Sequence, residues 1–396
     1  MSYSYRSVRT NAHSNNRRPR SYHSRAPQKQ NIDPRRFVAT ATAAEATPFE
    51  PIHVFKDFDL LPLLQRNVAE KGYTIPSPVQ DQAIPLGLKG HDVIGLAGTG
   101  TGKTAAFALP VLQRLLTDKQ SAALIVAPTR ELAQQIEEEM RSLAKQSGLN
   151  GTLLIGGTGM GKQLQELKSH PRIVIGTPGR IKDHINRRSL RLHLFNMVVL
   201  DEVDRMLDMG FIDDVRFILE QTNPNRQSFF FSATMAKRVE QLVQTFSKSP
   251  ITVSVETNRA SDNVHQDVVE FRGNMDRIEK LHELLLQETV TKVIVFDETQ
   301  RGVERLYGEL AARGFKAGSI HGGKNQGQRQ RALAQFKQNQ INILVATDVA
   351  ARGIDVADVS HVINYSIPKV YDDYIHRIGR AGRAGQIGYA FTFVSQ

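Results

Sequence analysis

Residues 97–104 read Ala-Gly-Thr-Gly-Thr-Gly-Lys-Thr, a sequence typical of a loop that binds phosphate. Glycines let the backbone turn its N–H groups toward phosphate oxygens, Lys103 places a cation on the transferring phosphate, and the Thr104 hydroxyl can coordinate Mg²⁺. Downstream, Asp201 and Glu202 open the sequence Asp-Glu-Val-Asp. Asp201 can reach Mg²⁺ bound to the phosphates, and Glu202 can orient and deprotonate a water molecule. Together the two motifs predict hydrolysis of a nucleoside triphosphate.

The segments around these motifs predict the strands and helices that would position them. An apolar run at 92–97 precedes the loop and a segment of helical composition follows at 105–116, although Ala97 stands where the common pattern has glycine. Other apolar runs also end at polar motifs, as expected for parallel sheets, which bind ligands at the carboxyl ends of their strands. These runs are 122–127, 172–175, 197–200, 228–231, 292–296, 341–346, 361–365 and 389–394.

The strand pattern restarts in the second half of the chain without a second Gly-Lys-Thr loop, so we expect two α/β domains. A chain of 396 residues with 40% hydrophobic content can build two cores. The expected division is a tail and linker (1–49), a nucleotide-binding domain (50–255), a linker (256–263) and a second domain (264–396). The absence of cysteine excludes disulfides and thiolate metal sites. No apolar run reaches the ~18–20 residues of a membrane span, so we expect a soluble, cytoplasmic protein.

Most of the net charge of +11 lies at the N-terminus. Residues 1–36 hold eight arginines and one lysine against Asp33 alone, and they contain few aliphatic residues. Such a segment cannot bury enough surface to offset its chain entropy, so we expect a disordered tail. Its charge favours binding to a polyanion. A solubilising tail and an organelle transit peptide are alternatives, although the tail lacks the amphipathic periodicity of transit peptides.

Short motifs from about Phe55 to the C-terminus follow the order seen in one helicase family. They are Pro-Thr-Arg-Glu-Leu-Ala (128–133), Gly-Gly (156–157), Thr-Pro-Gly-Arg (177–180), Asp-Glu-Val-Asp (201–204), Ser-Ala-Thr (232–234), Ala-Thr-Asp (346–348), Arg-Gly-Ile-Asp (352–355) and His-Arg-Ile-Gly-Arg-Ala-Gly-Arg (376–383). The ordered set resembles the DEAD-box ATP-dependent RNA helicases of superfamily 2. The resemblance implies an α/β fold of two tandem RecA-like domains with parallel sheets behind the disordered basic tail. It also implies ATP and Mg²⁺ as cofactors.

The resemblance assigns the ATP site residue by residue. The amide of Gln80 can donate and accept together, which matches the adenine edge and favours ATP. Tyr73 would stack on the base with Phe55 supporting it, although Phe55 also fits an ordinary core position. Thr104 and Asp201 would hold Mg²⁺, partly through water. The implied nucleotide-binding residues are Phe55, Tyr73, Gln80, Thr99, Gly100, Thr101, Gly102, Lys103, Thr104, Asp201 and Asp355. The implied catalytic residues are Lys103, Glu202 and two arginine fingers from the second domain, Arg380 and Arg383.

Two further sets of residues follow from the resemblance. Those that would grip the RNA backbone are Thr129, Arg130, Gly157, Thr177, Gly179, Arg180, Thr299, Gln326, Arg329 and Thr347. Those that would couple the two domains are Asp204, Ser232, Thr234, His376 and Arg377. Backbone contacts carry no sequence information, so we expect binding to most single-stranded RNAs and short duplexes.

The sequence departs from the family pattern at two positions of interest. Val203 replaces the alanine of the family's name, a conservative apolar change that we expect hydrolysis to survive. Gly323 stands where members of the family commonly have the aspartate of a His-Gly-Asp motif. The predicted function is a monomeric, ATP-dependent RNA helicase that closes on single-stranded RNA and unwinds short duplexes. The alternatives are an ATP-gated RNA clamp or annealing chaperone, and a DNA translocase of the same superfamily, against which Gln80 argues.

Overall fold

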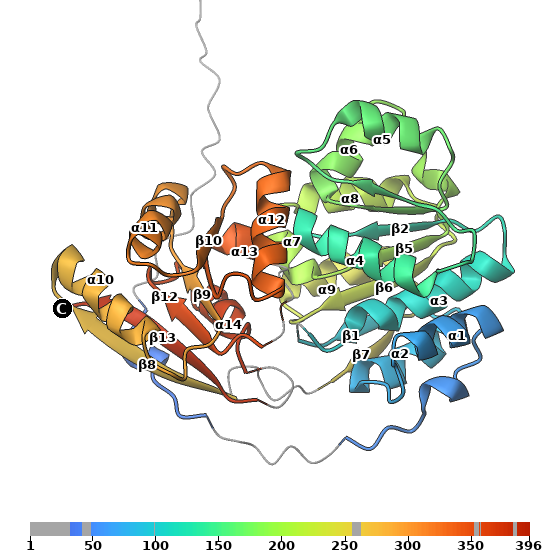
Figure 1. The fold of residues 1–396 in the computed structure, drawn as a ribbon. Helices are drawn as coiled ribbons and strands as arrows, with labels where there is room; N and C mark the ends of the chain where they lie inside the picture. Colours follow the sequence, from blue (N-terminus) through green and yellow to red (C-terminus); the bar gives the residue numbers. More distant parts are fainter. Residues whose placement is uncertain are drawn as a thin grey trace, which may run out of the picture. The chain divides into compact units, whose positions relative to one another are not determined.

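Two α/β domains, each built on one parallel sheet, make up the folded chain in the computed structural model (Figure 1). Thr99, Asp355 and Arg383 lie outside the described residues, as do most of the predicted tail and the linker between the domains. The described residues are 32–41, 49–98, 100–255, 263–351, 356, 358–382 and 386–396.

The first domain contains a seven-stranded sheet in the order β3-β4-β2-β5-β6-β1-β7, in which all neighbours pair in parallel. Its strands are β1 (Val93–Leu96), β2 (Ala123–Val126), β3 (Gly151–Leu154), β4 (Ile173–Gly176), β5 (Met197–Leu200), β6 (Gln227–Ser232) and β7 (Ile251–Ser254). The apolar runs predicted five of these. The two others, β3 and β7, close the edges of the sheet and leave some residues exposed, so they lack a continuous apolar run.

Helices cover both faces of this sheet because successive side chains of a strand point to opposite faces. Phe229 and Phe231 of β6 enter one core, whereas Phe230 enters the other. The first core packs against α1 (Pro62–Glu70), α2 (Pro78–Leu88), α3 (Lys103–Thr117) and α4 (Arg130–Leu143). The second packs against α5 (Met160–Leu167), α6 (Pro178–Asn186), α7 (Val203–Asp208), α8 (Ile212–Gln221) and α9 (Lys237–Phe246).

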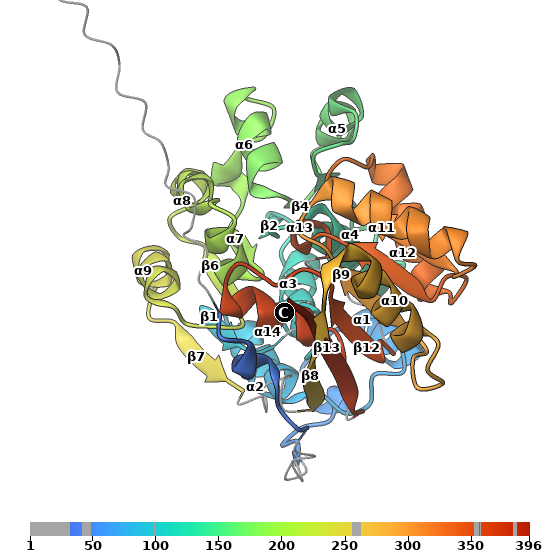
Figure 2. The same ribbon diagram turned by 90° about the vertical axis from the view of Figure 1, so that its left-hand side faces the viewer.

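The second domain repeats the plan with six parallel strands in the order β10-β11-β9-β12-β13-β8. The strands are β8 (Val264–Phe271), β9 (Val293–Phe296), β10 (Ala317–Ile320), β11 (Ile343–Ala346), β12 (His361–Asn364) and β13 (Gly388–Ser395). Helices α10 (Gly273–Leu285) and α11 (Gln300–Ala312) cover one face. Helices α12 (Gln326–Lys337), α13 (Asp348–Ala351) and α14 (Tyr371–Ile378) cover the other (Figure 2). Among the described residues, no helix combines the length and the apolarity that crossing a membrane requires.

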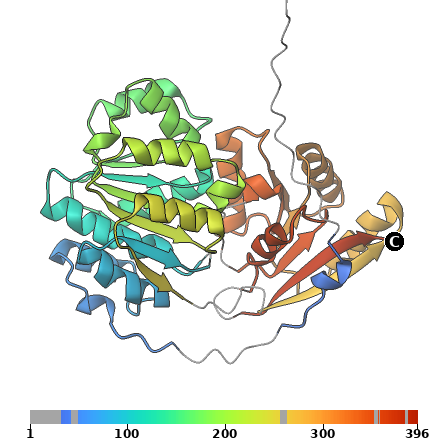
Figure 3. The same cartoon turned by 180° about the vertical axis from the view of Figure 1, so that it is seen from behind.

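Within the segment assigned to the tail and linker (1–49), residues 32–41 have a defined structure. They include a short 3-10 helix, η1 (Pro34–Phe37), and lie against β8 of the second domain (Figure 3). Ile32 is buried and Phe37 is fully buried in the same core as α12 and α14. Local composition missed this because two apolar side chains suffice when a distant part of the chain supplies the pocket.

Burial of a histidine in the second sheet makes this domain sensitive to acid. His361 is almost fully buried in β12 and stacks on Tyr389 and Phe391, with ring centroids 4.9 and 6.0 Å away. Burial lowers the pKa of its imidazole to about 4. The unfolded chain therefore takes up a proton near pH 6.5, whereas the folded chain does so only near pH 4.

The contribution of His361 to the free energy of unfolding is complete above pH 6.5. It is lost as the pH falls toward 4, at up to about 1.4 kcal/mol per pH unit. We expect His361→Gln to flatten the pH dependence of denaturant unfolding in this window. His193→Gln, at an exposed position, is the control and should leave the dependence unchanged. A wild-type slope in His361→Gln would contradict the prediction.

Candidate active site

The nucleotide motifs converge at the carboxyl edge of three adjacent strands. The phosphate loop follows β1, Asp201 follows β5 and Ser232 ends β6. The start of the loop is fixed to this edge, because the Ala97 N–H donates to the Ser232 carbonyl at 3.0 Å. Lys103, which begins α3, is 7% exposed and donates from Nζ to the Ala97 carbonyl at 3.2 Å. The ammonium group is thus held inside the curve of the loop, where an anion would neutralise it.

Helix α2 holds the phosphate loop from its other side. The Ser77 hydroxyl donates to the Thr101 carbonyl at 2.7 Å, and Gln80 Nε2 donates to the Gly102 carbonyl at 3.0 Å. Gly102 has a φ of +86°, and a Cβ there would lie 2.4 Å from Gln80 Nε2, so a larger residue would strain the backbone and displace the Gln80 amide. Gln80 Oε1 also accepts from the Ser77 N–H at 2.9 Å. The amide keeps one N–H and one lone pair for a further partner.

Tyr73, which packs on Phe55, lines a cavity beside this loop. Tyr73 and Phe55 stack with centroids 5.4 Å apart, and the Tyr73 hydroxyl donates to Glu139 at 2.9 Å. Burial and the Glu139 carboxylate raise the pKa of Tyr73, so its hydroxyl stays protonated. A cavity of about 410 Å³ is lined by Tyr73, Gly102 and Thr104, among others. The lining is mostly polar, and Tyr73 gives it one aromatic face on which a nucleobase can stack.

The carboxylates after β5 have opposite electrostatic environments. Burial raises the pKa of Asp201 to about 6, although Lys103 opposes the shift. Burial also disfavours the charge on Glu202, but Arg205 and Lys103 outweigh it and lower the Glu202 pKa. Arg205 Nη1 lies 3.0 Å from Glu202 Oε2, and both side chains are buried. Glu202 is therefore ionised and can accept a hydrogen bond. A cation bound next to Asp201 would favour the charged form of Asp201.

Asp204 connects this carboxylate motif to the end of β6. Its Oδ2 accepts from the Ala233 N–H at 3.0 Å, from the Thr234 N–H at 2.9 Å and from the Thr234 hydroxyl at 3.2 Å. The Ser232 hydroxyl accepts from the Asp204 N–H at 3.3 Å. Val203 points the other way into the core and is fully buried, so its two extra methyl groups are away from the carboxylates.

The RNA candidates of the first domain occupy the other half of the same edge. Thr129 follows β2, Thr177 follows β4 and Gly157 lies beyond β3, and these strands are neighbours in the sheet. Arg130 packs over Gly157, where a Cβ would lie 2.3 Å from its Nη1. Arg180 is held by the Thr158 carbonyl at 3.4 Å and by Gln163 at 3.2 Å. Gly179 follows at the start of α6, with open space around it.

In the second domain, Arg377 is fixed within its own domain. It forms two bonds to Asp348, of 2.5 and 2.7 Å, and donates to Asn364 at 3.1 Å and to the Ser366 carbonyl at 2.7 Å. This guanidinium orders the loops after β11 and β12. His376 and Arg380 lie nearby on and after α14, and their positive charges help to lower the Glu202 pKa.

Two second-domain RNA candidates contact the first domain. Arg329 Nη2 lies 2.8 Å from Glu131 Oε1, with both side chains buried, and Gln326 donates to Gln134 at 3.1 Å. Their partners lie on α4, directly after Thr129. The other two candidates follow strands: Thr347 is buried after β11, and Thr299 is exposed after β9, where its hydroxyl caps α11.

Four further residues of this site were not predicted from the sequence: Ser77, Asp81, Glu131 and Arg205. Ser77 had a signal, because Ser-x-x-Gln before an apolar run is a capping box. Asp81 accepts from the Ile52 and His53 N–H groups at 3.0 and 3.1 Å, which fixes the segment before Phe55. That contact and the pairs of Glu131 and Arg205 depend on packing and have no local signal.

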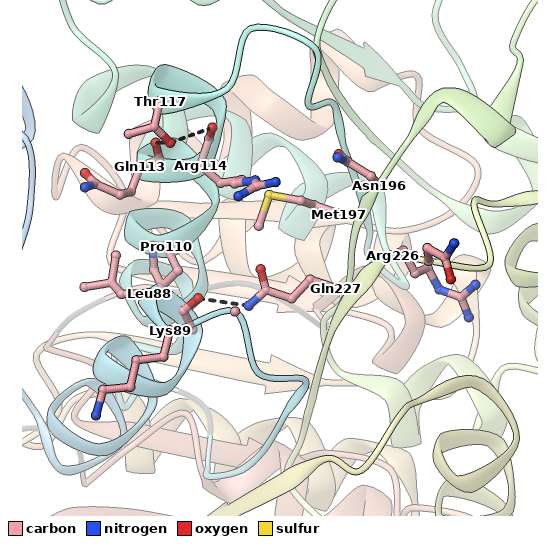
Figure 4. Close-up of a pocket in the computed structure, with 13 residues that line it drawn as sticks. Leu88, Lys89, Pro110, Gln113, Arg114, Thr117, Asn196, Met197, Arg226 and Gln227 are labelled. Carbon is pink, nitrogen blue, oxygen red and sulfur yellow. Dashed lines mark hydrogen bonds between the residues drawn. The ribbon is translucent and has the colours of Figure 1, made fainter.

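A separate polar pocket of about 490 Å³ lies at the opposite, amino-terminal edge of the first sheet (Figure 4). Arg114 of α3, Met197 at the start of β5 and Gln227 at the start of β6 line it. The Gln227 amide donates to the Gly87 carbonyl at 2.9 Å. No described residue of the phosphate loop lines this pocket.

Comparisons with known proteins agree with this geometry. A model of the DEAD/DEAH box helicase family matches residues 77–242, and a model of the helicase conserved C-terminal domain matches residues 276–385. The chain is 42% identical over 343 residues to the ATP-dependent RNA helicase CshA of Limosilactobacillus reuteri, which covers 86% of this chain and 69% of the relative.

Solved structures are similar as well. Dbp5 of S. cerevisiae bound to RNA and ADP BeF3 has 30% identity and a TM-score of 0.76, over 86% of this chain and 89% of that one. A DEAD box protein from Methanococcus jannaschii has 38% identity and a TM-score of 0.51, over 87% of this chain and 94% of that one. With helicase models matching both domains and a 42% identical relative aligned over most of both chains, the chain belongs to the DEAD-box family of ATP-dependent RNA helicases, which are RNA-dependent ATPases.

Proposed function

We propose that ATP binding closes the two domains on single-stranded RNA, that closure unwinds short duplexes locally or remodels RNA–protein complexes, and that hydrolysis reopens the domains. One observation carries the proposal. The carboxyl edge of the first sheet holds the nucleotide residues on β5, β6 and β1 and the RNA candidates on β2, β4 and β3. Arg329 of the second domain pairs with Glu131 at the RNA half. A second domain seated on this edge contacts both ligands.

The residues of the chain have distinct parts in this cycle. Lys103 and the loop N–H groups hold the phosphates, and Glu202 orients the attacking water by accepting its hydrogen bond. Asp201 fits Mg²⁺, because its buried carboxylate has a raised pKa that a cation would lower. When bound, Mg²⁺ neutralises phosphate charge. No group of three metal-ligating side chains occurs among the described residues, so phosphates and water would complete its coordination.

The proposal includes three further features. Gln80 reads adenine through the one N–H and the one lone pair of its amide that are not bonded to Gly102 and Ser77. The enzyme works as a monomer in the cytoplasm on most RNA sequences, because its RNA residues contact the sugar-phosphate backbone. Arg380 and Arg383 reach the transferring phosphate only when the domains close, so hydrolysis depends on RNA.

Strand displacement beside RNA binding tests the function. Lys103→Ala should abolish both ATP turnover and duplex displacement, because it removes the cation facing the phosphate. Glu202→Gln should keep ATP and RNA binding but stall turnover, because the amide keeps the shape and loses the base. Wild-type turnover in either variant would contradict the assigned roles. ATP-dependent RNA binding without displacement by the wild-type chain would favour a clamp over a helicase.

The arginine fingers predict a selective loss of hydrolysis. Arg380→Ala and Arg383→Ala should each reduce RNA-stimulated turnover by about 10³-fold, the scale of arginine fingers, with ATP affinity in the absence of RNA unchanged. The measurements are steady-state ATPase assays with RNA and nucleotide titrations without it. Arg301→Ala, at an exposed second-domain position, serves as the control. A loss of ATP affinity equal to the loss of turnover would place these residues in ground-state binding instead.

The basic tail predicts a change in salt dependence. Residues 1–31 carry seven of the tail's basic residues, and each phosphate that they neutralise should steepen log affinity against log salt by about 0.7. Deletion of 1–31 should therefore weaken RNA binding most at low salt and flatten the slope, while RNA-saturated turnover stays nearly intact. Fluorescence anisotropy over a salt series measures both slopes. Equal slopes would mean that the arginines serve solubility or targeting.

A further inference from the structure

The N-terminal segment 32–41, which we call the clasp, extends the second sheet by backbone pairing. The Ala39 N–H donates to the Gln266 carbonyl at 3.0 Å, and the Gln266 N–H donates to the Ala39 carbonyl at 2.7 Å. This antiparallel pair lies along β8, the edge strand of the otherwise parallel sheet. The Ala41 N–H adds a bond to His265 Nδ1 at 3.2 Å. The clasp therefore satisfies edge groups that would otherwise stay unpaired.

Side chains of the clasp also enter the hydrophobic core of the second domain. Phe37 is fully buried, and its ring centroid lies 4.7 Å from that of Tyr374. The guanidinium of Arg36 lies 3.8 Å from the centroid of Tyr371. The Tyr374 hydroxyl donates to Gln266 Oε1 at 2.9 Å, so the residue that pairs with the clasp backbone also orients the ring beneath Phe37. Burial of the Phe37 ring removes its apolar surface from water and so favours the bound position of the clasp.

The clasp precedes the first domain in the chain although it belongs to the second. Residues 42–51 separate it from Ile52 and His53, where Asp81 fixes the chain to the first domain. Residues 256–262 form the other connection, between β7 and β8. The eleven peptide steps from Ala41 to Ile52 span at most about 36–40 Å, and the eight steps from Val255 to Asn263 span at most about 26–29 Å, so each connection sets an upper limit on the separation of the domains.

We propose that the clasp gives the domains a second tether, which limits how far they separate and about which axis they turn. A body held by one short tether can swing about a point in every direction. A body held at two points turns mainly about the line that joins them. The clasp thus restricts the open ensemble of the enzyme. An ensemble with fewer open arrangements loses less entropy on closing, so the tether favours RNA binding in the presence of ATP. This last consequence rests on the proposed closure cycle, whereas the clasp and its tether do not.

Release of the clasp in the full chain tests the tether directly. Phe37→Ala removes the buried ring. Ala39→Pro removes the N–H that donates to the Gln266 carbonyl. Val38→Ala is the matched control, because Val38 is 55% exposed between them. Hydrogen exchange at the Gln266 amide should be slow in the wild type and in the control, and fast in both variants. Slow exchange of the Gln266 amide in both Phe37→Ala and Ala39→Pro would overturn the assignment.

Distances between the domains complete the test. The chain has no cysteine, so Arg191→Cys and Glu288→Cys, both at exposed positions, allow specific dye labelling. The distances are measured without ATP or RNA. We expect single-molecule energy transfer to show a broader distance distribution in Phe37→Ala than in the wild type. A protease site inserted between residues 42 and 48 gives the same test without touching either core, which covers the case that Phe37→Ala fails to fold. Cleavage should broaden the distribution while Gln266 stays protected. An unchanged distribution after cleavage would overturn the proposal.

Tether length links the clasp to the proposed function through a separate measurement. Doubling the seven residues 42–48 to fourteen with Gly-Ser should weaken ATP-dependent RNA binding about threefold, the cost of doubling a flexible loop. RNA binding without ATP should be unchanged. A broader distance distribution together with unaltered ATP-dependent RNA binding would retain the clasp and overturn the closure cycle. An unaltered distribution together with intact strand displacement would retain the cycle and overturn the clasp.

Discussion

Parallel pairing of the strands is the constraint on which the site depends, because it brings the carboxyl end of every strand to one edge of the sheet. Residues from Ala97 to Thr234 thereby meet although more than one hundred positions separate them. Strand order then divides the edge, with nucleotide residues on β5, β6 and β1 and RNA candidates on β2, β4 and β3. Asp204, bonded to the Ala233 and Thr234 N–H groups, joins the carboxylates to the end of β6. These hydrogen bonds fix the position of each motif relative to the other.

The central strands could be predicted from the sequence because both of their faces are buried. Runs such as Val-Ile-Val-Phe at 293–296 are apolar throughout, since helices cover each side of the sheet. Strands β3, β7, β8 and β10 lack this signature, because the edge positions leave part of each strand exposed or polar. The residues 32–41 were assigned to a disordered tail for a related reason. Their single pairing partner, β8, lies more than two hundred positions away.

The residues that bind phosphate could be predicted from the sequence more readily than the ion pairs that hold the surrounding loops and helices in place. Phosphate binding demands Lys103, Thr104 and glycines at fixed spacing, so residue type alone indicates the function of the loop. The Glu131–Arg329 and Arg377–Asp348 pairs have no such spacing rule, and they follow only from how the domains fold. Glu131, Arg329 and Arg377 are buried, so removal of the partner of any of them would leave a lone buried charge.

The N-terminal segment 32–41 precedes the first domain in the sequence but packs as part of the second domain. The second domain consists of residues 32–41 and the segment from β8 onward, with the whole first domain inserted between them. Phe37 packs with Tyr374 on α14, the helix that carries His376 and directly precedes Arg380. A change in the seating of Phe37 would therefore reach the helix whose charges act on Glu202. The segment before the first domain is thus connected, through one aromatic contact, to the arginines on which hydrolysis depends in the proposed cycle.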